Sequence, residues 1–357
     1  KLKNLNTSSN RNQPAIDLLS NPDDWKLRDT SADIYSFEDG SMIAKRRSYE
    51  SATILTKAEY ENFEVEFDFL VKRWCELIFL IHPAWNGADD AGLELVLSDH
   101  HDSAPSPTYA GALLEKRAPS AMAMHADDVW NHCRVRYDWP RFSVELNDVV
   151  IQDFDMSADP QFRYSLRKGP LGFRDLLGWG FEVQNMRLTP LPDSENGIRM
   201  YNGKDLTGWK EVRPRDAKWA ADGDTIIGTN GNGYLQYELP VQDFDLRFYY
   251  RTTPTANGGG FLRWMADDSD RGNEIQILDV AESVMPSGSI YSIARADTTG
   301  MRPVGEWQLL QLSVRGNHAI THLNGIRCAE TNGLTKVRPG HITLQMHKEN
   351  STIEFRD

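Results

Sequence analysis

Short stretches in which apolar and polar residues alternate dominate the chain, whereas sustained helical periodicity is almost absent. Alternation with a period of two is the pattern of a half-buried β-strand. Such stretches occur at residues 63–71, 76–82, 93–98 and 141–148, and again at 244–252, 260–264, 273–280, 307–314 and 341–347. Asn-Gly pairs, typical of tight turns, stand at 202–203, 232–233, 257–258, 324–325 and 332–333. The pattern predicts an antiparallel all-β sandwich or barrel.

The two halves of the chain carry the same signals in the same order. A tryptophan, an Asp-Gly pair and an alternating strand follow one another at Trp25, 39–40 and 62–69, and again at Trp209, 222–223 and 243–250. The spacing of Glu94 and Asp99 equals that of Glu274 and Asp279, and the spacing of Trp130 and Asn147 equals that of Trp307 and Asn324. A collinear series at nearly constant offset indicates two copies of one β-domain.

The length of 357 residues fits two domains of ordinary size. The Pro-rich polar stretch at 189–193 has the composition of a linker. We therefore predict a polar N-terminal tether at residues 1–22, a first, diverged β-sandwich at 23–190, and a second β-sandwich at 191–357.

Composition narrows the class of partner. The chain has 39 Lys and Arg residues against 52 Asp and Glu residues, a formal net charge of −13, and no basic face for a nucleic acid. Its three cysteines are far apart and odd in number, which excludes a disulfide framework and a Cys-rich zinc module. No apolar run is long enough to span a membrane. These features predict a soluble protein that does not bind nucleic acid.

The first stretch of the sequence is polar and begins with Lys1 rather than Met. This is typical of a tether that remains after a signal segment has been removed, although a trimmed chain would look the same. We therefore expect an exported protein, periplasmic or associated with the cell envelope. A lipid tether is one form that this association would take.

The second half resembles the 3-keto-disaccharide hydrolase family. The matching words are YNGKDLTGW at 201–209, NGGGFLR at 257–263, NEIQILD at 273–279, GSIY at 288–291, PVGEW at 303–307, LNG at 323–325, LQMH at 344–347 and FRD at 355–357. Their order and spacing both agree with the family, and the first half looks like a diverged member of it.

The resemblance implies both a fold and an activity. The implied fold is a tandem pair of concanavalin A-like, laminin G-like jelly rolls, each with two stacked antiparallel sheets of which one is concave. The implied activity is on sugars oxidised to a ketone at carbon 3, by elimination or hydrolysis of the glycosidic bond. Many members of the family are exported bacterial proteins.

The word NEIQILD supplies the first candidates for catalysis. Glu274 and Gln276 share one face of a strand, whereas Asp279 joins them only if a β-bulge intervenes. The pattern is similar to the E-x-D-x-x-E strand of jelly-roll β-glucanases, and a glycosidase pair lies roughly 5–10 Å apart. Because Gln276 replaces the middle carboxylate, ordinary retaining chemistry is disfavoured. Solvated charges at a strand end are the alternative interpretation of Glu274 and Asp279.

Other residues in the matching words have side chains suited to a sugar. Arg263 follows three glycines and could bind a sugar oxygen or an enolate, or pair with a carboxylate on the sheet. Gln345 and His347 share a face of their strand, and His347 suits a general base, with a structural histidine as the alternative. Tyr291 and Trp264 are candidates for the walls of a sugar site, although core packing is the commoner role of such aromatic residues.

The first half serves as an internal comparison. By the offset of the repeat, the residues that replace Arg263, Gln276, Gln345 and His347 are Ile81, Val96, Arg174 and Leu176. Glu94 and Asp99 remain while most polar partners are lost, so the second half is predicted to be the catalytic one. The Asp-His-His-Asp cluster at 99–102 has metal-compatible side chains, but adjacent residues cannot all converge on one ion, and a solvated loop is predicted. A divalent cation that polarises the ketone is left open, and no other cofactor is indicated.

The leading hypothesis is a carbohydrate-active hydrolase or lyase that cleaves 3-keto-glycosides. A ketone at carbon 3 acidifies the proton on carbon 2, so that a base can remove it and the carbon 1 substituent can leave by β-elimination. By chemical type, the base is His347 or Glu274. The enolate is bound by Arg263 together with Gln276 or Gln345. Asp279 is either the acid that protonates the leaving group or the carboxylate that orients the histidine. The alternatives are a non-catalytic carbohydrate-binding β-sandwich and a conventional jelly-roll glycoside hydrolase.

Overall fold

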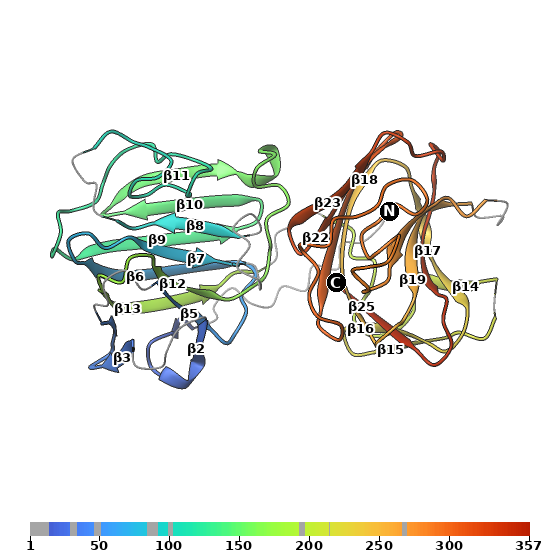
Figure 1. Ribbon diagram of the computed structural model, residues 1–357, viewed down its shortest axis with the longest axis horizontal. Helices are drawn as coiled ribbons and strands as arrows, with labels where there is room; N and C mark the ends of the chain where they lie inside the picture. Colours follow the sequence, from blue (N-terminus) through green and yellow to red (C-terminus); the bar gives the residue numbers. More distant parts are fainter. Residues whose placement is uncertain are drawn as a thin grey trace. The chain divides into compact units, whose positions relative to one another are not determined.

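The computed structural model describes residues 14–28, 34–45, 51–83, 92–98, 103–192, 197–213, 215–265 and 270–357. Within these ranges the chain forms β-strands and two 3₁₀ turns, Pro22–Asp24 and Met156–Ala158 (Figure 1). It divides into two compact units, Lys1–Asn196 (unit 1) and Gly197–Asp357 (unit 2). In the described part of the chain, no helix has the length and apolar character needed to cross a membrane.

Unit 1 contains two antiparallel sheets. The eight-stranded sheet has the order β11 (Val149–Asp155), β10 (Arg141–Leu146), β9 (Asn131–Asp138), β6 (Phe63–Val71), β13 (Phe181–Pro190), β4 (Ser41–Ala44) and β3 (Tyr35–Glu38), with β1 (Ile16–Asp17) also paired to β13. The five-stranded sheet has the order β2 (Trp25–Arg28), β5 (Ala52–Thr56), β12 (Leu171–Asp175), β7 (Leu77–Ile81) and β8 (Leu93–Val96).

Unit 2 repeats this arrangement. Its seven-stranded sheet has the order β15 (Lys218–Asp222), β16 (Thr225–Thr229), β25 (Thr352–Arg356), β18 (Phe244–Thr252), β21 (Gln308–Arg315), β22 (His318–Leu323) and β23 (Ile326–Thr331). Its five-stranded sheet has the order β14 (Trp209–Val212), β17 (Gly233–Val241), β24 (Gly340–Met346), β19 (Gly258–Trp264) and β20 (Asn273–Ile277). Both orders match those of unit 1, except that β1 has no counterpart among the described strands of unit 2. The prediction of an all-β chain of two tandem β-sandwiches is confirmed.

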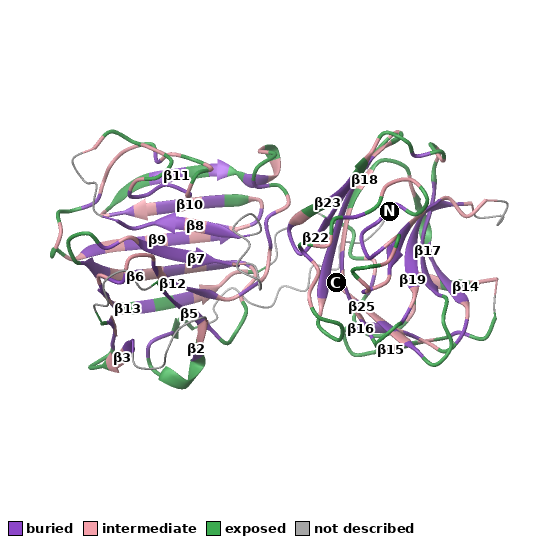
Figure 2. Ribbon diagram, viewed as in Figure 1, coloured by how far each residue is buried: buried purple, intermediate pink, exposed green. Residues whose placement is uncertain are grey.

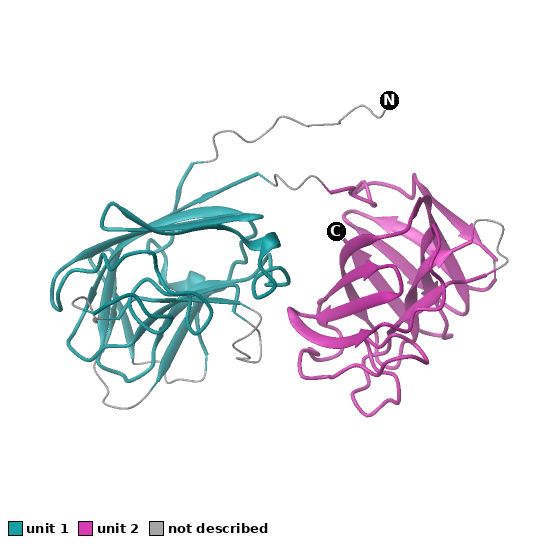
Figure 3. Ribbon diagram, turned by 90° about the horizontal axis from the view of Figure 1, so that it is seen from above, with its two compact units in different colours: residues 1–196 teal, residues 197–357 magenta. Residues whose placement is uncertain are grey.

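Each of the two units (Figure 3) has its own hydrophobic core, and its strands carry the buried residues (Figure 2). The alternation of the sequence produces it directly: in β6, Phe63, Val65, Phe67 and Phe69 are buried, and the intervening acidic residues are partly exposed. Because burying one face of every strand is the main driving force for folding, a strict period of two fixes which face points inward.

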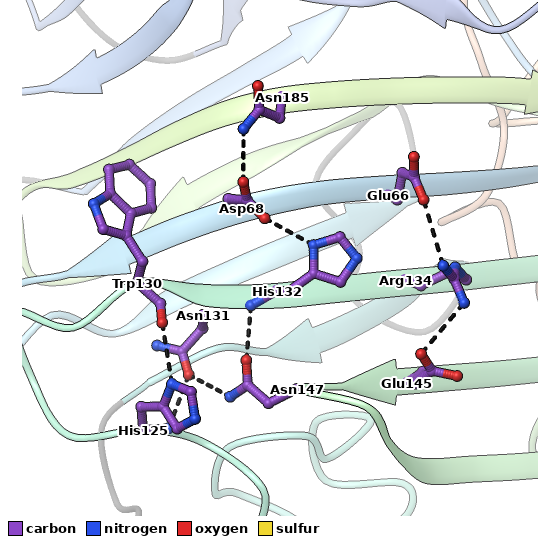
Figure 4. A network of polar contacts seen from close by, with 10 residues as sticks. All are labelled: Glu66, Asp68, His125, Trp130, Asn131, His132, Arg134, Glu145, Asn147 and Asn185. Atoms are coloured by element: carbon purple, nitrogen blue, oxygen red, sulfur yellow. Dashed lines mark hydrogen bonds and ion pairs between the residues drawn. The ribbon is translucent and has the colours of Figure 1, made fainter.

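The asparagine repeated in both halves has a structural role in each hairpin. Asn147 and Asn324 follow β10 and β22, and both have a positive φ, of 49° and 52°, a conformation that asparagine tolerates well. The Oδ1 atom of Asn147 accepts the backbone N–H of His132 at 2.8 Å, as shown in Figure 4, and Asn324 accepts that of Leu309 at 2.8 Å. The repeat at this position therefore reflects turn geometry.

The N-terminal boundary of unit 1 differs from the one expected. Ile16–Asp17 (β1) pairs with β13, and Leu18 and Leu19 are buried in the core, so the predicted tether extended too far into the fold. Residues 1–13 lie outside the described residues. At the other end, β13 ends at Pro190, the residue at which the first sandwich was predicted to end, although the linker-like stretch at 189–193 begins within this strand.

Candidate functional site

The candidate site lies on the face of the five-stranded sheet of unit 2 that points away from the core. Alternate residues of β17, β24, β19 and β20, among them Leu235, Leu344 and Ile275, belong to the core. The residues between them form what we call the outer face: Tyr234, Gln236, Gly259, Phe261, Glu274, Gln276, Thr343 and Gln345. It combines one carboxyl group with amides and aromatic rings, a composition suited to a sugar.

Strand register brings three predicted residues together on this face. Gly259 pairs with Gln276 on one side and with Gln345 on the other, and Phe261 pairs with Glu274. The three polar side chains therefore lie on neighbouring strands around a glycine. The Oε1 atom of Gln345 is buried and has no hydrogen-bond partner among the described residues, which leaves a buried acceptor able to take a hydroxyl donor.

Gly259 leaves the space that the carboxyl group of Glu274 occupies. A Cβ atom at this position would lie 2.9 Å from Oε1 of Glu274 and 2.8 Å from the carbonyl oxygen of Ile275. Any other residue would push the carboxyl group aside. The structurally equivalent residue of unit 1 is Ile78, which pairs with Val96 and Arg174 as Gly259 pairs with Gln276 and Gln345.

Burial on this face alters the acid–base behaviour of Glu274. Desolvation raises its pKa from 4.5 to about 7, and the nearby Arg271 opposes this by favouring the charged form. A carboxyl group that exchanges its proton near neutral pH can act as a general base or acid there.

The same carboxyl group makes the stability of unit 2 depend on pH. Between pH 4.5 and about 7, Glu274 keeps a proton in the folded state that it has lost in the unfolded chain. The contribution of this proton to the free energy of unfolding is therefore complete below pH 4.5 and is lost as the pH rises through 7. Glu274→Gln cannot ionise. Its melting temperature relative to wild type should therefore rise across this window and then level off, as calorimetry over a pH series would measure. A difference that stays constant with pH would contradict this expectation.

An aromatic cluster occupies one end of the outer face. The ring centroids of Tyr234 and Trp264 are 4.9 Å apart, and that of Phe261 lies 5.1 Å from Trp264 and 6.0 Å from Tyr234. Trp264 is fully buried in this cluster rather than forming an open wall. The guanidinium carbon of Arg271 lies over both Tyr234 and Trp264, at 5.3 Å and 5.8 Å from the ring centroids.

Arg263 is not on the outer face, contrary to the expectation from sequence. It has a φ of 62° at a register shift in β19 and is 1% exposed. Its guanidinium donates to the carbonyl oxygens of Gln242, Gly316 and Lys336 at 2.7–2.8 Å and to Asp243 at 3.2 Å. These bonds join three turns at one end of the sandwich and use the donors that a substrate would need.

Asp279 is also placed away from the outer face. Its carboxyl oxygens accept hydrogen bonds from the hydroxyls of Tyr250 at 2.9 Å, Ser287 at 2.6 Å and Thr252 at 2.6 Å. Tyr250 and Thr252 belong to β18 of the opposite sheet, and Asp279 itself is buried. The structure thus places Asp279 in the interior. The register of β20 is regular over its described length, so this strand has no bulge that would align Asp279 with Glu274.

His347 and Tyr291 lie at the rim of the outer face. The backbone N–H of Tyr291 donates to the carbonyl of Glu274 at 2.9 Å, and its side chain is 48% exposed. His347, also exposed, follows β24 and donates its backbone N–H to Asn257, whose side chain accepts from Gln276 at 3.3 Å. Both are therefore near the polar group predicted from sequence.

In unit 1 the corresponding face is largely apolar. Leu55, Ile78, Leu80, Val96 and Ala112 form a buried cluster there. Glu94 persists at the position of Glu274, but Arg174 donates to it at 2.6 Å and both side chains are mostly buried. This pairing neutralises the one carboxylate that unit 1 has in common with the site.

One correspondence inferred from sequence is wrong by one residue. The register pairs place His82, and not Ile81, at the position of Arg263. Both His82 and Arg263 have a positive φ, of 51° and 62°, and Gly169 approaches His82 as Gly340 approaches Arg263. The buried His82 contacts the carbonyl of Leu166 through Nδ1 at 2.8 Å, so the position is structural in both units.

Among the described residues, no group of three or more His, Cys, Asp or Glu side chains lies close enough to hold a metal ion. The cluster at 99–102, including Asp99, lies outside the described residues.

The structure adds three residues that the sequence did not single out. Tyr234 contributes an aromatic ring to the outer face, Gly259 the room that the carboxyl group of Glu274 occupies, and Arg271 a cation. The three consecutive glycines in NGGGFLR were the signal for Gly259. Nothing in the sequence distinguished Tyr234 or Arg271 from other aromatic and basic residues.

The fold is a pair of tandem β-sandwiches, and the family to which the chain belongs is carbohydrate-related. The chain belongs to the family described as 3-keto-alpha-glucoside-1,2-lyase-like domain, whose family model matches residues 15–188 and 197–357. The resemblance found in the sequence is thereby confirmed for both halves. No match was found among proteins with curated descriptions.

Similar solved structures each align with about half of the chain. A candidate glycosyl hydrolase from Parabacteroides distasonis ATCC 8503 has 20% sequence identity over 47% of this chain and 94% of its own, with a TM-score of 0.41. A second one from the same organism has 18% identity over 48% and 89%, also with a TM-score of 0.41. The carbohydrate-binding module CBM66 from Bacillus subtilis has 15% identity over 46% and 93%, with a TM-score of 0.34.

Proposed function

We propose that unit 2 is a lyase domain that cleaves 3-keto-glycosides, with Glu274 as the base that removes the proton from carbon 2. The observation that carries this proposal is the carboxyl group of Glu274, whose pKa of about 7 suits proton abstraction near neutral pH. It lies against Gly259 of β19, whose register partners on the two flanking strands are Gln276 and Gln345. Membership of the family supports the class of substrate.

The proposed reaction balances without a co-reactant. Glu274 accepts the carbon 2 proton, the C–H electron pair forms the C2=C3 double bond, and the carbonyl π pair moves to the ketone oxygen. When this enolate collapses, a C1=C2 double bond forms and the C1–O bond breaks. The leaving oxygen takes a proton, for which the exposed His347 is the candidate donor. The products are an alcohol and an unsaturated 3-keto sugar, and later addition of water to that sugar gives net hydrolysis.

The amides at the site bind the sugar rather than react with it. Gln345 offers a buried carbonyl oxygen without a donor among the described residues, which fits a sugar hydroxyl. Gln276 is held by Asn257 through its Nε2 atom at 3.3 Å and fixes that edge of the site. Their positions on opposite sides of Gly259 place the sugar ring over β19.

A panel of chromogenic glucosides tests this function. We expect release of the aglycone from a 3-keto-α-glucoside and none from the ordinary α-glucoside, together with exchange of the carbon 2 proton in deuterium oxide, followed by NMR. Cleavage of the ordinary glucoside at a similar rate would favour a conventional glycoside hydrolase. Sugar binding in calorimetry with neither release nor exchange would favour a carbohydrate-binding protein. Either of these results would overturn the proposal.

A further inference from the structure

Arg271 lies beside the candidate base at the end of the outer face. Its Nη1 atom donates to the hydroxyl of Tyr234 at 3.1 Å, and its guanidinium stacks over the rings of Tyr234 and Trp264. Phe261 packs against both rings and is paired in register with Glu274. The cation and the carboxyl group therefore flank one aromatic cluster.

The guanidinium of Arg271 has no carboxylate partner within ion-pair distance among the described residues. The neighbouring Asp270 instead pairs with Lys336 at 2.7 Å and Arg338 at 3.0 Å. Arg271 is partly exposed, so part of its planar fork of donors stays open to a ligand. A guanidinium already held against two rings loses little freedom when it binds an oxygen atom.

We propose that Arg271 binds the ketone oxygen of the substrate and stabilises the enolate that forms when Glu274 removes the carbon 2 proton. This inference rests on the proposed function and assigns to Arg271 the role that the sequence suggested for Arg263. A preorganised donor at the place where negative charge develops acts on the transition state more than on the bound substrate.

Two further observations support this assignment. Arg271 lowers the pKa of Glu274 against the effect of burial, so the cation that would stabilise the enolate also favours the ionised base. In the repeat, Gly92 of unit 1 corresponds to Gly272 of unit 2, and the residue before it is Ala91 where unit 2 has Arg271. Unit 1, whose corresponding face is apolar, therefore has no arginine at this position.

The test uses the full chain with three substitutions at this position. Arg271→Met keeps the apolar stem on the rings, Arg271→Lys keeps the charge, and Arg271→Ala opens space for a free guanidinium ion. We expect Arg271→Met to lower kcat on the 3-keto-α-glucoside by about 10²–10³-fold with a smaller change in KM. Added guanidinium chloride should restore part of the activity of Arg271→Ala.

The pH profile separates a role in the reaction from a purely structural one. Without the cation, the rise of kcat/KM with pH should move to higher pH, because the carboxyl group of Glu274 loses a group that favours its charged form. Arg327→Met is the matched control, since Arg327 is exposed and pairs with Glu330 elsewhere in unit 2. Its kinetics and pH profile should equal those of wild type.

The outcomes distinguish this inference from the function on which it rests. A wild type that releases no aglycone would overturn both. An active wild type, with Arg271→Met at similar kcat and an unmoved pH profile, would overturn the role of Arg271 alone. If Arg271→Met fails to fold, Arg271→Ala decides the matter: activity equal to wild type without guanidinium, or no rescue by added guanidinium, would overturn the inference.

Discussion

Glu274→Gln is expected to lower kcat on a 3-keto-glucoside by about 10²–10⁴-fold. Glutamine has nearly the same shape and fits beside Gly259, but it cannot accept the proton from carbon 2. Its folding should be intact, because the substitution removes a buried carboxyl group whose ionisation is unfavourable in the folded protein. Initial rates near pH 7.5, with a melting curve of the same sample, would measure the loss.

The matched control is Glu94→Gln, the same change at the equivalent position of unit 1. Glu94 faces an apolar cluster and is paired with Arg174, so its replacement should leave kcat unchanged. It should lower the stability of unit 1, because the mostly buried Arg174 loses its ion pair with Glu94. A loss of activity as large as that of Glu274→Gln would mean that both halves contribute to the site, and a mechanism confined to unit 2 would have to be abandoned.

Arg263→Met is expected to destabilise unit 2 by about 3–4 kcal/mol, since three turn carbonyls and Asp243 lose the donor that joins them. For a domain of this size, that corresponds to a fall in melting temperature of roughly 10 °C. At a temperature well below the transition, kcat should remain close to that of wild type, because the guanidinium does not reach the outer face. Calorimetry and initial rates on the same preparation would measure both quantities.

Arg315→Met provides the comparison for stability. Arg315 pairs with Asp245 at 2.6 Å, but both side chains are about half exposed, and such surface pairs contribute about 0–1 kcal/mol. Its melting temperature should therefore stay near that of wild type. If Arg263→Met kept its stability and lost activity instead, the sequence-based assignment of Arg263 to substrate binding would be right and the structural one wrong.

The sequence was a good guide wherever a strand stayed regular. Glu274 and Gln276 were predicted to share one face of their strand, and Gln345 was a predicted substrate-binding residue on another strand. The structure brings all three together around Gly259. Parity along a regular strand is a local property, and it survives folding because one face of each strand must be buried.

The sequence-based prediction failed where the backbone departs from a regular strand. Arg263 stands at a register shift with a positive φ, which turns its side chain toward the turns of the sandwich. Asp279 was assigned to the site on the assumption of a bulge, but β20 ends at Ile277, and the carboxyl group reaches hydroxyls of the opposite sheet. A bulge leaves no clear mark in a sequence, because several backbone conformations can accommodate the same residues.

The sequence by itself determined the all-β fold, the division into two related sandwiches, the family, and the strand that carries Glu274. These follow from alternation, turn residues and repetition, which act over short distances along the chain. Only the tertiary structure decided which of the predicted residues share the outer face, which arginine lies beside the base, and how far burial raises the pKa of Glu274. Such properties depend on which strands become neighbours and on the desolvation that this produces, and neither is encoded at any single position.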